Sequence, residues 1–266
     1  MELRWGDSAT IVKLLEKIIR REGIGDVLAD GTRVAAKRIG KGSEQYAMEV
    51  GGQEAPMHDP RFDPGFAVVY QAEPTPGRHT IASLAYGELM SLEEKFTTLK
   101  KPPAFTWNSD RRKPDKGQFL AVNTAYTNAA NGAGLCLFGL IIGGDVPIFD
   151  WINAVTGWQK SNDEYLEIGH RILALRQSFN LREGVDPRGT RLPDRILGRQ
   201  PLERGPLAGV TLDNEAMVED YYRHLGWNPA TGWPTRERLS ELGLADVAAA
   251  VYDAADKAGT VASPNR

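Results

Sequence analysis

The stretch Asn131-Gly132-Ala133-Gly134-Leu135-Cys136-Leu137-Phe138 ends a helical pattern that runs from about Gln118 to Ala130. It contains Cys136, the only cysteine in the 266 residues. A single thiol cannot complete a disulfide, a zinc site or an iron–sulfur cluster, because each needs two to four such ligands. A metal-binding Cys136 therefore requires ligands from another polypeptide. The alternative interpretation is a small buried apolar side chain between Leu135 and Leu137.

Outward from this turn, apolar residues recur at helical spacing over most of the chain, which predicts a mainly α fold. A first helix is expected from Ser8 to near Gly23, with one buried stripe formed by Ile11, Leu14, Leu15, Ile18 and Ile19. A second helical stretch, from Val27 to Ile39, is expected to break near Gly31. A helix over residues 81–92 is predicted to be stopped by Pro102-Pro103, and another helix is predicted over residues 118–130. Ser161 and Glu164 form a capping box that predicts the start of a helix running through Leu175. The last helices are predicted over residues 214–225, 235–242 and 245–258.

Proline-rich and polar segments separate these helices. Five prolines and several glycines between Gly51 and Pro76 make a long helix improbable there, so we expect a loop region. The boundary between two sub-regions is placed near Glu49, with residues 1–48 ending one helical domain and 49–266 forming the next. Residues 108–116 and 186–207 are expected to be surface loops.

Composition limits the classes of partner. The formal charge of −3 provides no concentrated basic surface, which argues against nucleic acid or an anionic membrane as a partner. The longest apolar run, Leu135 to Ile142, contains Gly139 and is far shorter than the roughly 20 residues of a membrane helix. The first residues lack the basic and apolar blocks of a secretory signal. One cysteine is typical of a reducing compartment, so a cytoplasmic location is expected.

The Cys136 turn resembles the Asp-x-x-Gly-Leu-Cys turn of the aldehyde ferredoxin oxidoreductase family, with Asn131 at the acidic position. Members are tungsten or molybdenum pterin enzymes that oxidise aldehydes to carboxylic acids. The likeness runs in family order along nearly the whole chain and covers only the carboxy-terminal part of the family. It includes residues 4–7, 21–26, 57–61, 76–80, 163–169, 179–184, 221–227 and 239–243.

The resemblance implies roles for individual residues. Cys136 would be the fourth ligand of a [4Fe–4S] cluster, the other three coming from an upstream Cys-x-x-Cys-x-x-x-Cys run. Asn131, Leu135 and Leu137 would contact the tungstopterin or molybdopterin. An Asp accepts pterin N–H bonds as an anion, whereas Asn131 offers one carbonyl acceptor and an NH₂ donor, which implies a weaker or rearranged contact.

His79 is the candidate acid–base residue. In the family a histidine at this place lies by the metal and can hydrogen-bond the aldehyde oxygen or move a proton, which suits a group titrating near neutrality. The alternative is a loop histidine at the start of a helix. Thr75 and Ile81 stand where some members carry basic residues toward the cofactor phosphates, which leaves Arg78 as the nearest cation. His58 is interpreted as structural.

Two functions of different class follow. In the first, the chain is the carboxy-terminal part of an aldehyde ferredoxin oxidoreductase-like enzyme acting on a small aldehyde. Another polypeptide then supplies the amino-terminal pterin-binding part and three cluster cysteines, and ferredoxin accepts the electrons. In the second, the chain is a catalytically inactive truncated helical domain or a protein-interaction module. The first predicts an apolar, concave, exposed surface near His79 and Cys136.

Overall fold

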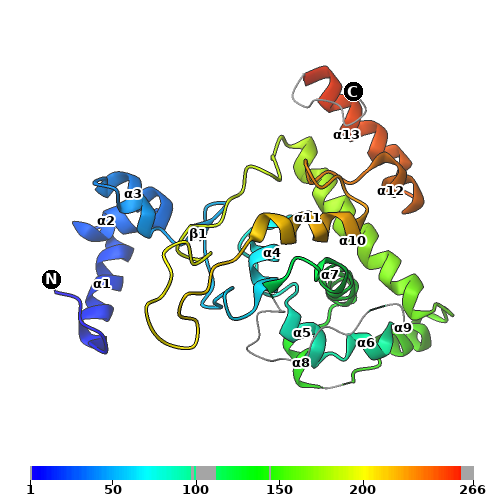
Figure 1. Cartoon of the computed structure of the whole chain (residues 1–266), viewed down its shortest axis with the longest axis horizontal. Coiled ribbons are helices and arrows are strands. Elements are labelled where there is room, and N and C mark those ends of the chain that lie inside the picture. The colour runs from blue at the N-terminus through cyan, green and yellow to red at the C-terminus, as the bar shows by residue number, and fades with distance from the viewer. Residues whose placement is uncertain (1, 97–98, 100–111, 144, 259–266) are drawn as a thin grey trace.

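The computed structural model describes residues 2–96, 99, 112–143 and 145–258 (Figure 1). It is 54% helix and 3% strand, which confirms the mainly α fold. The elements are α1 Ser8–Arg20, α2 Ile24–Leu28, α3 Thr32–Ile39, η1 Ser43–Tyr46, β1 Glu49–Val50, β2 Gln53–Glu54, α4 Pro64–Ala72, α5 Leu84–Leu89, α6 Leu92–Lys95, α7 Gly117–Gly132, α8 Leu137–Ile142, α9 Ile148–Thr156, α10 Asn162–Arg182, α11 Asn214–Leu225, α12 Arg236–Glu241 and α13 Ala245–Ala258.

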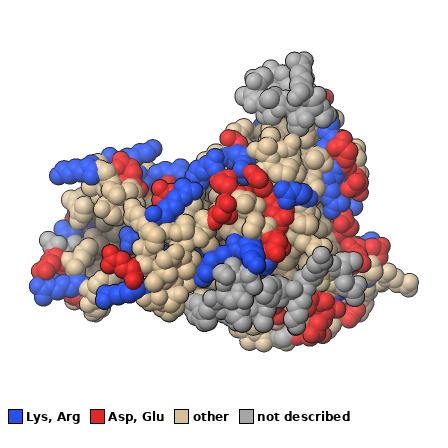
Figure 2. All heavy atoms as spheres, viewed as in Figure 1, with Lys and Arg blue, Asp and Glu red and all other residues tan. Residues whose placement is uncertain are grey.

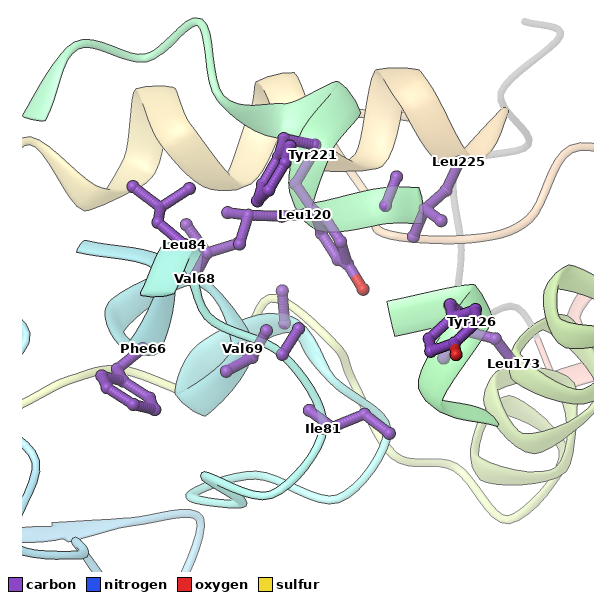
Figure 3. Packing of buried hydrophobic residues seen from close by; sticks show 14 of the residues in the cluster. Phe66, Val68, Val69, Ile81, Leu84, Leu120, Tyr126, Leu173, Tyr221 and Leu225 are labelled. Atoms are coloured by element: carbon purple, nitrogen blue, oxygen red, sulfur yellow. The ribbon is translucent and has the colours of Figure 1, made fainter. Parts of the chain in front are cut away.

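The core is built around α7, which is buried along most of its length. Helices α10 and α11 pack on α7, and α4 packs on α11. The close-up of the core shows side chains of α4, α7, α10 and α11 directed toward a shared interior, Val68, Leu120, Leu173 and Tyr221 among them (Figure 3). Helix α10 approaches α7 closely at Gly169, where a Cβ atom would lie 1.9 Å from the carbonyl oxygen of Ala125. Only glycine permits this contact.

The predicted first helix forms, but its cap and its burial differ from expectation. Asp7, rather than Ser8, is the N-cap, and its carboxylate accepts the backbone N–H of Thr10 at 3.0 Å. The stripe expected to be buried is open, since Ile11 is 49% and Ile19 81% exposed and no residue of α1 is buried. The break near Gly31 is confirmed, because this residue has φ +85° and separates α2 from α3.

The hydrophobic core begins at Val50, while the domain boundary near Glu49 stays a prediction. Helices α1 to α3 lie at one end of the molecule (Figure 1). Acidic and basic side chains are interspersed over the described part of the face in Figure 2, and no continuous basic patch is visible there. Among the described residues, no helix is both long and apolar enough to cross a bilayer.

The interpretation of residues 51–76 as a loop region was wrong in its second half, where the buried helix α4 forms. Asp63 caps this helix, and Pro64 occupies its first turn. Proline is favoured there because the N–H it lacks has no partner in the first turn of a helix. The proline therefore starts a helix at this position. Before it, β1 and β2 form a short antiparallel hairpin.

The apolar helices around the cysteine turn also differ from expectation. The helix predicted over 81–92 is two short helices, α5 and α6, separated at Met90 and Ser91, where Ser91 adopts φ +50°. Helices α8 and α9, which follow Cys136, were not predicted. Pro102-Pro103, expected to end the former helix, and residues 108–111 of the expected polar loop lie outside the described residues.

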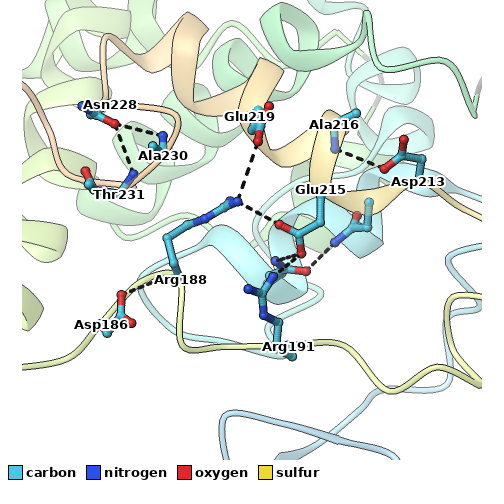
Figure 4. A network of polar contacts seen from close by, with 12 residues as sticks. Asp186, Arg188, Arg191, Asp213, Glu215, Ala216, Glu219, Asn228, Ala230 and Thr231 are labelled. Carbon is cyan, nitrogen blue, oxygen red and sulfur yellow. Dashed lines mark hydrogen bonds and ion pairs between the residues drawn. The ribbon is translucent and has the colours of Figure 1, made fainter.

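The later helices agree with prediction. Ser161 and Glu164 form the capping box of α10, and α11, α12 and α13 begin within one residue of their expected positions. The segment between α10 and α11 runs over the surface but is anchored by buried Leu192 and Leu197. Its arginines at 188 and 191 both bond to Glu215 on α11 (Figure 4). These contacts hold a long irregular segment against the helical core.

Candidate functional site

His79 lies in the loop between α4 and α5, and a buried carboxylate, Asp63, ties the carboxyl end of that loop to the start of α4. The side chain of Asp63 accepts backbone N–H groups from Gly65 at 2.9 Å, Leu84 at 3.2 Å and Ala85 at 2.9 Å. It therefore bonds to the first turns of both helices. Within the loop, Gly77 N donates to Tyr70 O at 2.9 Å. The loop that carries His79 is therefore held at Gly77 and at its carboxyl end.

The imidazole of His79 stacks on His58, with ring centroids 4.9 Å apart and planes inclined by 29°. His58 in turn stacks on Phe66, also at 4.9 Å. The pKa of His79 is lowered from its ordinary value, first by burial and then by the proximity of His58 and Arg78. His79 is thus neutral at pH 7 and able to accept a proton. Sequence reasoning missed this partner, because the proximity of His58 to His79 depends on how α4 packs.

The cysteine turn joins α7 to α8. Gly134 has φ +84° and no atom within 4 Å of a Cβ position, so the turn is open to its surroundings. Cys136 is the N-cap of α8 and is exposed. The alternative interpretation of Cys136 as a small buried apolar side chain is therefore wrong. Asn131 and Leu135 are partly buried, whereas the side chain of Leu137 is in the core. Any contact of Leu137 with a ligand would use its backbone.

Arg176 on α10 connects the His79 loop to the helix that leads into the cysteine turn. It forms an ion pair with Glu73, which precedes the loop, and its Nη2 donates to Thr75 Oγ1 at 2.8 Å. Its Nη1 also donates to Asn128 Oδ1 at 3.2 Å, one turn of α7 before Asn131. The structure therefore couples the two sequence motifs through a third element. No local pattern predicts this residue, since its partners lie far from it in the sequence.

Two exposed apolar surfaces adjoin the candidate residues. A groove of about 360 Å³ opens beside His58 and is lined in part by Met57, Tyr70 and Ile196. Next to Cys136, Phe138 is 55% and Ile142 80% exposed on α8. Large exposed apolar side chains near candidate ligands are typical of a surface that another component covers. The single concave apolar surface expected near both His79 and Cys136 stays a prediction, since the groove and the exposed side chains of α8 are two separate features.

The described residues hold no group of three or more His, Cys, Asp and Glu side chains that could bind a metal. Cys136 can thus provide one ligand, and a cluster needs further thiolates from outside the described part of the chain. Its exposed position and the open glycine turn fit contact with a bound group.

Comparison with known proteins shows which family the chain resembles over its length. A family model described as aldehyde ferredoxin oxidoreductase, domains 2 and 3, matches residues 1–244. A tungsten-containing aldehyde ferredoxin oxidoreductase of Pyrococcus furiosus is 32% identical over 244 residues, covering 91% of this chain and 38% of that protein. Its counterpart in Thermococcus kodakarensis is 30% identical over the same coverage. The chain therefore spans little more than a third of the length of these relatives.

Two further proteins extend the comparison. An aliphatic sulfonate oxidoreductase, WOR-like subunit, of Pyrococcus furiosus is 30% identical over 260 residues, 92% of this chain and 36% of that protein. Among solved structures, the active site complex BamBC of benzoyl coenzyme A reductase with 1,5-dienoyl-CoA matches 98% of this chain and 42% of its own, with a TM-score of 0.59. The identity there is 21%, so this likeness concerns the fold alone.

Proposed function

The chain belongs to the aldehyde ferredoxin oxidoreductase family, and we propose that it is the carboxy-terminal part of a tungsten or molybdenum pterin oxidoreductase completed by another polypeptide. The observation that carries this proposal is the exposed thiol of Cys136 at the start of α8, with no group of metal ligands around it in the described chain. A lone exposed thiol in this turn is suited to completing a ligand set that begins elsewhere.

The residues of the cysteine turn would hold one side of the bound group. Cys136 would supply the fourth thiolate of a [4Fe–4S] cluster, and Asn131 with the backbone from Leu135 to Leu137 would contact the pterin. When bound, the metal–pterin group supplies two-electron oxidation and the cluster supplies single-electron transfer to ferredoxin. The chain would position the bound group and the substrate, exclude water from the site and transfer a proton.

His79 would handle the proton in the oxidation of a small aldehyde to a carboxylic acid. Addition of a water-derived oxygen to the aldehyde carbon releases protons, and a neutral imidazole with a lowered pKa can accept one at pH 7. The bonds of Asp63 to the first turn of α5 hold the carboxyl end of the loop, and the stack on His58 orients the ring. Such fixed placement is what general acid–base catalysis requires.

The second polypeptide would carry the amino-terminal pterin-binding part and three cluster cysteines. The open apolar surfaces of α1 and α8 offer it places to pack. The single cysteine of the chain favours a reducing compartment, so we propose that this assembly works in the cytoplasm. The competing proposal is a catalytically inactive helical domain or interaction module.

The test is anaerobic purification of the native complex, followed by metal analysis and electron paramagnetic resonance. We expect tungsten or molybdenum, and a reduced-cluster signal that Cys136→Ala removes, while Ser240→Ala, a control at another exposed position, keeps it. His79→Asn should retain metal and cluster but lower aldehyde oxidation by about 10²-fold or more. A colourless, metal-free chain without a partner, or a cluster signal unchanged in Cys136→Ala, would favour the inactive module.

A further inference from the structure

A cavity of about 340 Å³ lies where α6, α7, α9 and the start of α10 meet. Helices α6 and α9 are neighbours at one corner of the molecule (Figure 1). Lys95 on α6 pairs with Asp145, which precedes α9, and Asn162 Nδ2 on α10 donates to Lys95 O at 3.3 Å. These contacts hold together the elements around the cavity. None of the candidate cofactor residues lines it, so the cavity is distinct from the site described above.

Tyr126 on α7 brings a hydroxyl without a partner to this cavity. The residue, labelled in Figure 3, lines the cavity and is only 1% exposed. Edge-on contacts fix its ring, with centroid distances of 5.5 Å to Phe149 and 6.2 Å to Phe96. Among the described residues the hydroxyl has no hydrogen-bond partner, yet it is not enclosed in the core. A buried hydroxyl raises the free energy of the fold unless it is bonded, and a bound molecule can supply that bond.

The charge of the cavity is dominated by acidic groups. Three carboxylates line it, those of Glu94, Asp145 and Asp150. The one ammonium group, that of Lys95, is engaged by Asp145, whereas the other two carboxylates form no ion pair within the described chain. Asn162 uses its Nδ2 on Lys95 O, which leaves its Oδ1 as a further acceptor. The groups left unengaged around the cavity are therefore mainly hydrogen-bond acceptors of negative charge.

We propose that this cavity binds a small organic ammonium ion, recognised by the carboxylates of Glu94 and Asp150 together with the hydroxyl of Tyr126. An ammonium group carries N–H donors and no acceptor, so it complements a cavity whose free groups accept hydrogen bonds. Bonds between an ammonium and a carboxylate are charge-assisted and stronger than neutral ones. Residues 146–149 add an apolar wall, which suits a short hydrocarbon stem on the ammonium ion.

Two other classes of ligand fit the cavity less well. A metal ion needs closely grouped ligands, and within the described ranges no three His, Cys, Asp or Glu side chains are grouped in that way. An anion would meet three carboxylates. Although α9 begins at the cavity, Asp150 already places a negative charge in the first turn of this helix. The proposed site does not depend on the bound cofactor or on Cys136.

The test titrates n-butylammonium into the full chain at pH 7 and constant ionic strength, followed by calorimetry and by amide NMR shifts in residues 145–150. We expect saturable binding to the wild type and about fivefold weaker binding to Tyr126→Phe, which loses one hydrogen bond to the ligand. Tyr126→Phe should keep the wild-type unfolding midpoint, because the hydroxyl has no partner in the free chain. The double variant Glu94→Gln/Asp150→Asn should bind about tenfold more weakly.

A matched control and two analogues make the test specific. Glu203→Gln/Asp246→Asn removes the same charge from exposed positions outside the cavity and should bind like the wild type. 1-Butanol keeps the stem without the charge, and tetramethylammonium keeps the charge without an N–H donor, so both should bind about tenfold more weakly or less. The site is overturned by a lack of saturable binding to the wild type, by equal binding of either analogue, or by unchanged affinity in Tyr126→Phe or in the carboxylate double variant.

Discussion

Replacement of Asp63 tests whether one carboxylate holds the His79 loop in place. The side chain is completely buried and accepts three backbone N–H groups, two of them at the start of α5 and one in α4. Hydrogen bonds to a charged group contribute about 1.5–3 kcal/mol each, and an ordinary N-cap contributes about 1 kcal/mol. Because neighbouring bonds are not additive, Asp63→Ala should lower the free energy of unfolding by about 3–5 kcal/mol.

Two comparisons make the expectation specific. Asp63→Asn keeps one oxygen acceptor but loses the charge and points an NH₂ group at a donor, so it should cost about 2 kcal/mol. Asp213 caps α11 from an exposed position through one bond to Ala216 at 3.3 Å, and Asp213→Ala should cost about 1 kcal/mol. Urea unfolding at pH 7 gives all three values. Hydrogen exchange of residues 64–90 should quicken in Asp63→Ala before the rest of the core opens.

The reasoning is refuted if Asp63→Ala costs no more than Asp213→Ala. That outcome would mean that backbone groups of α5 find solvent or other acceptors once the carboxylate is gone. A large loss of stability without faster exchange in residues 64–90 would separate the carboxylate from the loop. In that case the position of His79 would depend on Arg176 and the ring stack.

Two further predictions concern histidines. Burial, followed by the charge of Arg238, lowers the pKa of His170 to about 4, against an ordinary value of about 6.5. The free energy of unfolding should therefore be unaffected by His170 above pH 6.5 and should fall by about 3 kcal/mol as the pH is lowered to 4. Urea unfolding across this range should show a smaller fall in His170→Gln. For His79, the His58→Phe substitution keeps an aromatic ring on Phe66 but removes a neighbouring titratable group, so the pKa of His79 should rise in a ring-proton NMR titration. An unchanged pKa would show that His58 does not contribute, leaving burial and the charge of Arg78 as the causes.

Local sequence predicted the helices whose signals are contained within one turn or one face. The capping box at Ser161 and the break at Gly31 are examples, because a cap and a left-handed glycine act over a few residues. Helix α4 escaped prediction because proline was weighed as a helix breaker, whereas Asp63 immediately before it turns Pro64 into a helix start. Helix α8 is short, apolar and β-branched in part, a composition that periodicity alone cannot assign.

The candidate site was only partly predictable for a related reason. Cys136 and His79 each stand in a motif, so a resemblance carried along the sequence identifies them. His58 and Arg176 act through packing between distant segments, and their partners follow from the fold. Arg176 illustrates the limit, because its position on the amphipathic helix α10 is typical of a solvated charge, yet it bonds to two other segments.

The exposed apolar side chains of α1 disagree with the burial that their spacing in the sequence predicts. Its apolar residues recur at the spacing of a buried face, and full burial of an Ile or Leu side chain contributes about 1.5–3 kcal/mol. In the structure Ile11 and Leu15 forgo about half of that contribution and Ile19 most of it, although the helix is well capped. Phe138 and Ile142 beside Cys136 do the same. A pattern that predicts full burial, where the folded chain supplies only part of it, is best explained by a surface on another component, which is where the proposed second polypeptide would pack.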